Sequence, residues 1–509
     1  MRTIHTIGLL LMTILAHTQD KFPKSSGLFV HTDKVIYQNN ERIWFTAYIL
    51  NLPSPDSAIL YNTLYITLIN GKTHAPVLSA RYVMDAAISQ GSLLLPDTLS
   101  PGDYSLVAYT NNYPRNPYDK EFQQWISVRS LNKAPFRVPA ASRKQPVANG
   151  RTMPPTKVWV SLVPDSMDYH RRSKSTWKVR FIDENGRPVK GIFSVSCVYA
   201  KRLPDERKQD IQHFYYVGQY GPEKKVTLTN NLDITKPVNG YVTLGEKKPR
   251  KPVRMVLMKG KSMLSFKTRE DGTFTLPDST LYAPANSTAV VSAAGGWNQS
   301  ISRVHVVETM DSINRQLARQ DYPYTIPMNP RDPLDTSVFS GQELMGRYRQ
   351  LREVVIKANN EPGFINGMPV KEDSTCGSWV CSAGHWRCTK TFPSIPAIAG
   401  QRYFDPVREM YIVFKGCPQD FSQQEFIKKV NPTYYAEEFP VEDYSNSESA
   451  DELHLNTTLY WEYMLATNTK GEATFSFYTN DLTGIFTCGI QAITETDPVS
   501  LYCNINVVE

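Results

Sequence analysis

The sequence predicts an all-β chain made of tandem small β-sandwich domains, with one cysteine-rich α+β region. Apolar and polar residues alternate with a period of two along most of the chain, as in strands that bury one face. Repeated turn signals separate such strands. A length of 509 residues with 41% hydrophobic residues is enough for several separate cores.

The first predicted sandwich covers residues 28–130. Apolar side chains at alternate positions of 43–49 share one face of a strand. A second alternating strand follows the proline and glycine of 100–103, which suit a chain reversal. The segment 131–155 is rich in proline and basic residues, and we expect a linker there.

Three further turn signals lie beyond this segment. Gly186, Gly272 and Gly471 each follow a polar residue and precede an alternating strand. Glycine adopts a positive φ without steric cost, so each signal predicts a β-hairpin. Their repetition predicts repeated use of small β domains.

Shifts in composition divide the remaining chain. Acidic residues among serine and asparagine are typical of an exposed connector. The predicted units are a second sandwich at 156–235, a small β domain at 236–308, a linker with a short helix (342–352) at 309–352, a cysteine-rich region at 353–430, an acidic linker at 431–455 and a C-terminal β unit at 456–509.

The N-terminus has the pattern of a secretory signal peptide, predicted at residues 1–18. Arg2 precedes an apolar run from Ile7 to Ala16, and a weak cleavage site follows. A buried first helix is the alternative. No later run has the roughly 18 to 20 apolar residues of a membrane helix. We therefore expect an exported chain without a transmembrane segment after cleavage.

The chain is mildly basic, with a formal charge of +7, and this charge identifies no partner by itself. Basic residues cluster at 171–174 and at 247–251, beside turn residues. Such clusters suit phosphates or acidic glycans, but solvated loops are the favoured interpretation. No nucleic-acid partner is predicted.

Six of the seven cysteines are predicted to form disulfides, because an exported chain enters an oxidising compartment. The six are Cys376, Cys381, Cys388, Cys417, Cys488 and Cys503. The first four allow three pairings that the sequence does not separate. His385 lies among them, so a zinc site is the alternative.

Cys488 and Cys503 are predicted to pair with each other. A hairpin that turns at Glu495 and Thr496 places them opposite one another on adjacent strands. Cys197 lies in another alternating strand, and we expect a buried free thiol because no activating base is identifiable.

Catalytic motifs are missing from the sequence, which has no G-x-S-x-G, H-E-x-x-H, P-loop or G-x-G-x-x-G pattern. His305 and Glu308 lie in an apolar strand, where a structural role is favoured. No catalytic, cofactor-binding or metal-binding residue is therefore assigned. Aromatic residues that suit either protein or sugar contacts or buried packing are Tyr109, Tyr113, Tyr118, Trp379 and Trp386.

Residues 29–37 (FVHTDKVIY), 42–48 (RIWFTAY) and 101–106 (PGDYSL) resemble the macroglobulin-type β-sandwich near the N-terminus of alpha-2-macroglobulin-like proteins. Residues 240–300 look like a carboxypeptidase regulatory-like domain. The stretches LREVVI (351–356) and INGMPV (365–370) look like fragments of a TonB-dependent receptor plug.

This order of segments is similar to a group of exported Gram-negative proteins. The resemblance implies tandem immunoglobulin-like or macroglobulin-like β-sandwiches with a small cysteine-rich, plug-like α+β region. It also implies a location in the periplasm, at the outer membrane or at the cell surface, and partners among envelope or outer-membrane proteins.

Two departures from these families limit the function. The residues after the plug-like fragment are too few for about 22 barrel strands of about 9 to 11 residues each. Opsonin-type macroglobulins trap targets with a thioester between a cysteine and a glutamine three residues on. Here Gln419 lies two residues after Cys417 with a proline between, so covalent trapping is not expected.

The leading hypothesis is a non-enzymatic binding or scaffolding protein of the bacterial envelope, an adaptor in an outer-membrane assembly without a cofactor. The first alternative is a thioester-less, macroglobulin-like protease-binding protein with a bait segment in 131–155 or 431–455. The second is a carbohydrate-active enzyme, which requires paired carboxylates about 5 to 10 Å apart in a cleft.

Overall fold

The computed structural model consists mainly of β-strands, and the predicted all-β fold is confirmed. The signal peptide (1–18), the linker 131–155 and the predicted helix 342–352 lie outside the described residues. The described residues are 27–52, 55–113, 120–129, 156–205, 208, 210–217, 237–260, 262–294, 302–319, 364–365, 368–373, 379–381, 385–387, 394–397, 401–415, 425–445 and 453–509.

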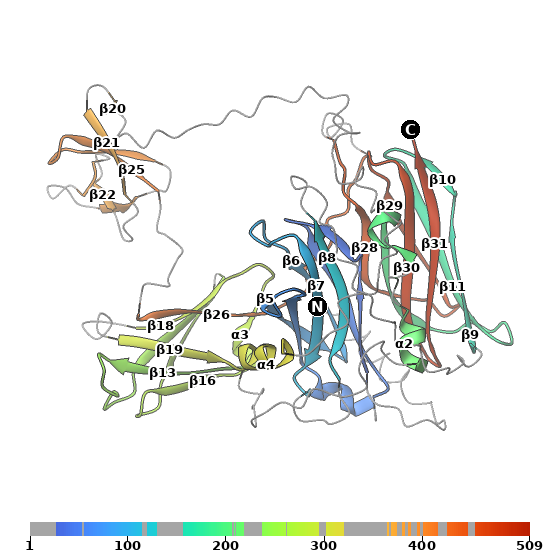
Figure 1. Ribbon diagram of the computed structural model, residues 1–509, viewed down its shortest axis with the longest axis horizontal. Helices are drawn as coiled ribbons and strands as arrows, with labels where there is room; N and C mark the ends of the chain where they lie inside the picture. The colour runs from blue at the N-terminus through green and yellow to red at the C-terminus, as the bar shows by residue number, and fades with distance from the viewer. Residues whose placement is uncertain are drawn as a thin grey trace.

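The first sandwich, blue in Figure 1, spans residues 27–129. Its strands are β1 (Gly27–Thr32), β2 (Ile36–Gln38), β3 (Arg42–Leu50), β4 (Thr63–Asn70), β5 (Pro76–Asp85), β6 (Ile88–Leu94), β7 (Gly102–Thr110) and β8 (Phe122–Arg129). Their order is β1-β3-β6-β5-β4-β7-β8-β2. Because β5 pairs with β4 along most of its length and with β6 at its end, it joins two halves of the sheet around one core.

The second sandwich is assembled from two distant parts of the chain. It has a five-stranded sheet in the order β10-β31-β30-β12-β28 and a three-stranded sheet in the order β29-β11-β9. Its strands are β9 (Val158–Pro164), β10 (Asp168–His170), β11 (Lys174–Asp183), β12 (Gly191–Tyr199), β28 (Thr458–Ala466), β29 (Glu472–Tyr478), β30 (Gly484–Thr494) and β31 (Pro498–Val508).

The sequence predicted 156–235 and 456–509 as separate units, and this division needs correction. All nine residues of β12 are buried, so β12 needs a neighbour on each side, and both neighbours come from the C-terminal segment. Segments near in space but far in sequence leave no mark on local periodicity, so residue patterns did not indicate this pairing.

The three predicted turns also differ from simple hairpins. Gly186, Gly272 and Gly471 adopt positive φ values of 75°, 85° and 69°, as glycine turns require. However, each turn connects strands that belong to different sheets, as between β11 and β12 or between β28 and β29. Strands β11 and β12, for example, face each other across the core that they share instead of pairing edge to edge.

A third β domain is inserted between β12 and β28 (green and yellow in Figure 1). One sheet has the order β16-β13-β19 and the other β15-β14-β18-β26. The strands are β13 (Val238–Leu244), β14 (Arg254–Lys259), β15 (Ser262–Lys267), β16 (Thr273–Leu276), β17 (Tyr282–Ala283), β18 (Ala289–Ala293), β19 (Ser302–Glu308) and β26 (Ile427–Val430). Since β26 lies within the segment predicted as cysteine-rich (353–430), this domain too is built from separated parts of the chain.

The cysteine-rich region is in turn inserted between β19 and β26. One sheet has the order β20-β21-β25-β24, and β22 pairs with β23. The strands are β20 (Phe364–Ile365), β21 (Met368–Asp373), β22 (Trp379–Cys381), β23 (Ser394–Pro396), β24 (Arg402–Asp405) and β25 (Met410–Phe414). Their small core includes Trp386 and Ile412.

Short elements and an extended segment connect the domains. Helix α2 (Ile211–Val217) contacts β1 and β31, and α4 (Thr309–Leu317) packs on the first sandwich. Strand β27 (Thr433–Tyr434) pairs with both β5 and β17. The described part of the predicted acidic linker 431–455 therefore makes specific contacts, among them an ion pair between Glu437 and Arg42.

Candidate functional site

The structure places three cysteines in one row across the second sandwich. Cys488 in β30 lies opposite Cys503 in β31, so the predicted register of this hairpin is confirmed. Cys197 in β12 lies opposite Cys488 on the other side. All three are free thiols in the structure, and Cys197 and Cys488 are buried.

The four-cysteine cluster lies almost wholly outside the described residues. This holds for Cys376, Cys388 and Cys417, and of Cys381 only the backbone in β22 is described. The two disulfides predicted among them therefore stay predictions. Within the described part of the chain, no group of three acidic, histidine or cysteine side chains is placed to bind a metal ion.

Polar side chains of the first sandwich contact the second sandwich at a buried interface. Lys34 lies in the FVHTDKVIY segment, and its Nζ donates hydrogen bonds to the hydroxyls of Thr457 (2.9 Å) and Thr458 (3.1 Å) and to Glu41 (3.2 Å). Thr458 donates to Asp33 at 2.7 Å. Burial raises the pKa of Asp33, although Lys34 opposes this shift.

His31 lies at the same interface, and its contact with a serine has the form of a catalytic histidine–serine pair. Its Nδ1 lies 2.6 Å from the hydroxyl of Ser194, and its ring packs on Trp461. The side chain is only 3% exposed, and burial lowers the pKa of His31 to about 3. A neutral, buried histidine therefore joins the two sandwiches.

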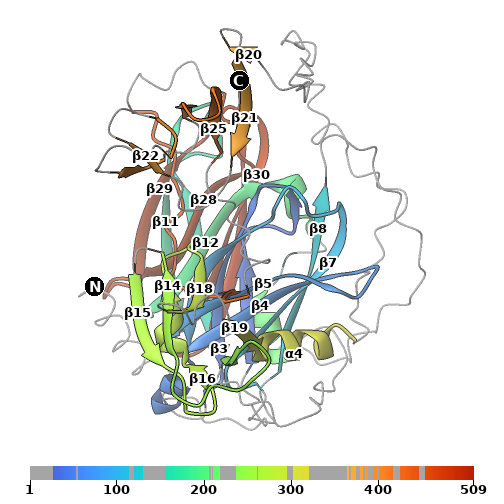
Figure 2. The ribbon, with the colours of Figure 1, turned by 90° about the vertical axis from the view of Figure 1, so that its left-hand side faces the viewer.

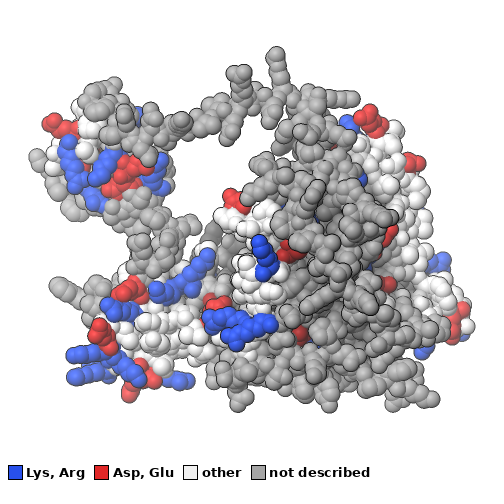
Figure 3. All heavy atoms as spheres, in the orientation of Figure 1, with Lys and Arg blue, Asp and Glu red and all other residues white. Residues whose placement is uncertain are grey.

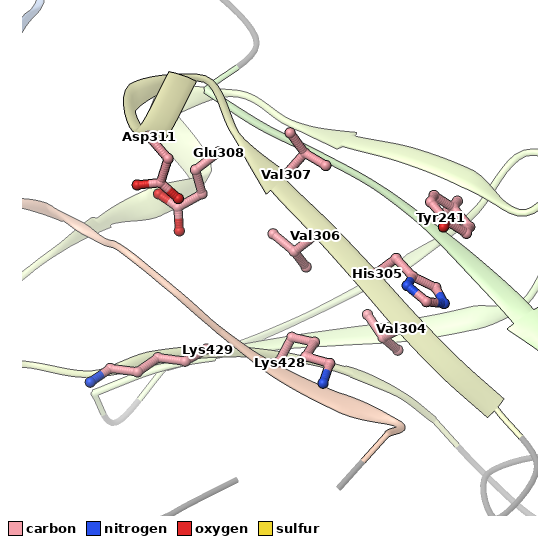
Figure 4. Close-up of a pocket in the computed structure, with 9 residues that line it drawn as sticks. All are labelled: Tyr241, Val304, His305, Val306, Val307, Glu308, Asp311, Lys428 and Lys429. Carbon is pink, nitrogen blue, oxygen red and sulfur yellow. The ribbon is translucent and has the colours of Figure 1, made fainter. Parts of the chain in front are cut away.

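A surface hollow of about 360 Å³ lies on the inserted domain, between β19 and β26 (Figure 4). Tyr241 and His305 stack at one end, with ring centroids 4.4 Å apart. Glu308 and Asp311 lie at the other end, and Lys428 and Lys429 come from β26. The apolar strand pattern around His305 and Glu308 predicts a structural role for both residues.

At the acidic end of this hollow, the carboxylate of Glu308 already forms hydrogen bonds and an ion pair with other residues. Glu308 accepts hydrogen bonds from the backbone amide (2.8 Å) and side chain (3.1 Å) of Asn431, and it lies 3.7 Å from Arg81. Burial raises the pKa of Glu308. These contacts connect the inserted domain to the first sandwich, so Glu308 acts as an interdomain anchor.

The predicted basic clusters differ in their surroundings. In the first cluster, Arg172 forms a bidentate ion pair with Asp481, with N–O distances of 2.9 and 2.8 Å. In the second cluster, all residues of 247–251 except Pro249 are exposed. Figure 3 shows the basic side chains gathered, with acidic ones among them, on the inserted domain.

Of the aromatic residues for which surface contact and buried packing were both open, several are buried. Tyr109 stacks on Tyr65 and donates a hydrogen bond to Asn314 of α4. Tyr113 and Trp386 are also buried. Tyr118 and the side chain of Trp379 lie outside the described residues.

The most exposed apolar strand of the inserted domain is β15, at the left of Figure 2. It forms one end of its four-stranded sheet. Met263 is 73% exposed and Leu264 is 41% exposed. Residue alternation does not reveal this edge, because it indicates a strand but not whether the strand has a second neighbour.

Comparisons with known proteins show only distant similarity. No family model matches, and no curated protein matches. A structure of Escherichia coli alpha-2-macroglobulin activated by porcine elastase is 9% identical with a TM-score of 0.26. The matched region covers 94% of this chain and 43% of the macroglobulin chain. Salmonella alpha-2-macroglobulin reacted with methylamine is 9% identical with a TM-score of 0.26, and the matched region covers 97% of this chain and 40% of the Salmonella chain.

The adhesin InvE of Yersinia pseudotuberculosis is 11% identical with a TM-score of 0.14, and the matched region covers 55% of this chain and 58% of the InvE chain. The chain thus spans about two fifths of the length of these macroglobulins. With scores this low, none of the likenesses carries an argument about function. Among the described residues, no helix has the length and apolar character needed to cross a membrane.

Proposed function

We propose that this chain is a non-enzymatic, extracytoplasmic protein-binding scaffold of the bacterial envelope, and that it binds a partner by strand addition at β15. The observation that carries the proposal is the open edge of the sheet β15-β14-β18-β26. Every described side chain of β15 except Phe266 is exposed, and no other described strand pairs with its outer side. An exposed apolar edge is a template for another extended chain.

The backbone register identifies the groups that are available for pairing. The amide of Thr268 donates to the carbonyl of Val253 beside β14, so even-numbered residues of β15 face β14. The amides of Met263, Ser265 and Lys267 therefore point outward. They can donate hydrogen bonds to an added strand, and Met263 and Leu264 add apolar contact area.

Charge indicates the chemistry of the partner segment. In the segment 246–271, which includes β15, exposed basic residues outnumber exposed acidic ones, namely Lys247, Lys248, Arg250, Lys251, Arg254, Lys267 and Arg269 against Glu246, Glu270 and Asp271. Complementary charge guides association and fixes orientation. The preferred partner is therefore an extended, acidic segment of another protein.

Site-specific photo-crosslinking in cells tests this function. A photoreactive residue at Met263 should capture one protein through an acidic, extended segment, whereas one at Val407, which is 82% exposed in the cysteine-rich region, should not capture it. Ser265→Pro removes an outward amide without breaking a bond to β14, so it should abolish the crosslink. A crosslink that survives Ser265→Pro, or that forms equally at Val407, would contradict strand addition.

The identity of the captured protein separates the two binding functions. Envelope or outer-membrane proteins would support the scaffold, whereas peptidases alone would favour the macroglobulin-like protease-binding alternative. A carbohydrate-active enzyme would instead release sugars from glycan substrates, and that activity would not depend on Ser265.

A further inference from the structure

Cys488 has two cysteine neighbours on adjacent strands. Directly opposed residues of neighbouring strands share one face of the sheet. Cys197, Cys488 and Cys503 therefore project to the same side, where all three contact the core of the second sandwich. Either neighbour could become the covalent partner of Cys488, and the backbone pattern decides between them.

The pair Cys197 and Cys488 is a non-hydrogen-bonded pair. The amide of Tyr199 donates to the carbonyl of Thr457, on the side of β12 that faces β28. Residues two apart in a strand point their amides the same way, so Cys197 also directs its backbone groups toward β28 and away from β30. The Cys197 and Cys488 side chains thus lie in the closer type of cross-strand pair.

The pair Cys488 and Cys503 is a hydrogen-bonded pair, the more widely spaced type. The amide of Asn506 donates to the carbonyl of Met167, away from β30. Cys503 lies three residues before Asn506, so its backbone groups point the opposite way, toward β30, and form hydrogen bonds with the backbone of Cys488. Its side chain is accordingly farther from Cys488 than that of Cys197, so a Cys488–Cys503 disulfide is the more strained and more readily exchanged of the two, since a disulfide prefers Cβ atoms about 3.8 Å apart.

Side-chain contacts and burial agree with this assignment. Burial raises the pKa of Cys488, and the neighbouring Cys197 thiol raises it further. Both residues are completely buried, whereas Cys503 is only partly buried. Cys503 is therefore the thiol of the three that an outside reagent reaches first.

We propose that these cysteines form a thiol-exchange site, in which Cys503 admits oxidising equivalents and Cys197–Cys488 is the final disulfide. The oxidant is a small-molecule or protein disulfide. The Cys503 thiolate attacks one sulfur of that disulfide and forms a mixed disulfide, while the other sulfur leaves as a thiol with the proton from Cys503.

Two internal exchanges complete the reaction. Cys488 attacks the sulfur of Cys503, forms a Cys488–Cys503 disulfide and releases the second thiol of the oxidant. Cys197 then attacks the sulfur of Cys488, and Cys503 leaves as a free thiol with the proton from Cys197. In sum, Cys197 and Cys488 lose two electrons and two protons, and the oxidant becomes two thiols.

The final bond links the two parts of the second sandwich. Cys197 precedes the inserted domains in sequence, and Cys488 follows them. A crosslink across so long a loop removes many conformations of the unfolded chain. It fixes β12 to β30 in the sandwich core, independently of any partner at β15.

Disulfide mapping of the full chain tests the proposal directly. Trypsin releases Cys197 in the peptide 191–201, whereas Cys488 and Cys503 lie together in 471–509, which contains no internal lysine or arginine. After incubation with glutathione disulfide and blocking of free thiols, the wild type should give 191–201 linked to 471–509. Cleavage at Glu495 should then place the linked cysteine at Cys488, with Cys503 blocked as a thiol.

Single substitutions test the route. Cys503→Ser should form the same bond, but slower by at least about tenfold, because the remaining thiols are buried. Cys197→Ser should accumulate the Cys488–Cys503 loop within 471–509. A stable Cys488–Cys503 loop in the wild type, three free thiols after oxidation, or an unchanged rate in Cys503→Ser would overturn the proposal.

Discussion

Single buried charges connect the domains of this protein, and Arg81 is the clearest example. It lies in β5 of the first sandwich and is 0% exposed. Its guanidinium interacts with Asp278, Glu308 and Asp311, all of which lie in or beside the inserted domain. Burial raises the pKa of each carboxyl, and Arg81 opposes these shifts.

We expect Arg81→Met to destabilise the protein by about 3–5 kcal/mol at pH 7, because it leaves buried carboxylates without their cation. A carboxyl with a raised pKa takes up its proton more readily in the folded state than in the unfolded state. The loss should therefore shrink as the pH falls from 7 toward about 5. Denaturant unfolding followed by tryptophan fluorescence at both pH values measures it.

Arg303→Met is the control for this prediction. Arg303 forms an exposed ion pair with Glu425, so its loss should change stability by less than about 1 kcal/mol. Equal effects of the two substitutions, or a larger Arg81→Met deficit at acidic pH, would show that Arg81 does not neutralise the buried carboxylates.

At the scale of elements, close packing within the inserted domain depends on one missing side chain. Strand β13 pairs with β16 on one side and β19 on the other. A Cβ atom at Gly240 would lie 2.3 Å from Cζ of Phe274 and 2.5 Å from the carbonyl oxygen of His305. The carbonyl belongs to the neighbouring strand, so it cannot move without breaking the sheet.

Gly240→Ala should accordingly destabilise the inserted domain by about 1–3 kcal/mol through overpacking. The thermal unfolding midpoint of the full chain should fall, whereas Ser262→Ala on the exposed strand β15 should leave it unchanged. A midpoint unaffected by Gly240→Ala would mean that β13 and β19 tolerate a wider spacing.

The whole molecule is a set of nested insertions. The second sandwich is interrupted by the inserted domain, which is interrupted by the cysteine-rich region. The two sandwiches share a buried interface in which Lys34 bonds to Thr457 and Thr458. The C-terminal strands therefore stabilise both sandwiches.

Truncation and excision should have opposite effects. A chain that ends at residue 455 loses β28 to β31 and exposes the core around β12, so its second sandwich should not fold. A chain in which residues 237–445 are replaced by a glycine-serine linker keeps every strand of both sandwiches. It should resist proteolysis and keep a cooperative unfolding transition.

Limited proteolysis of the two shortened proteins distinguishes the outcomes. A protease-resistant fragment of about residues 156–217 from the truncated chain would contradict the composite sandwich. Loss of both sandwiches in the excised chain would show instead that the inserted domain is needed for their folding.

The sequence by itself determined the local properties of this protein. Alternation identified strands, Gly186, Gly272 and Gly471 identified turns, and turn position gave the register that sets Cys488 opposite Cys503, because these properties depend on neighbouring residues. Tertiary structure decided which strands share a sheet, that β15 is an edge, and that Cys197 lies beside Cys488. Those relations join segments hundreds of residues apart, and a buried strand has the same apolar pattern whichever neighbour covers it.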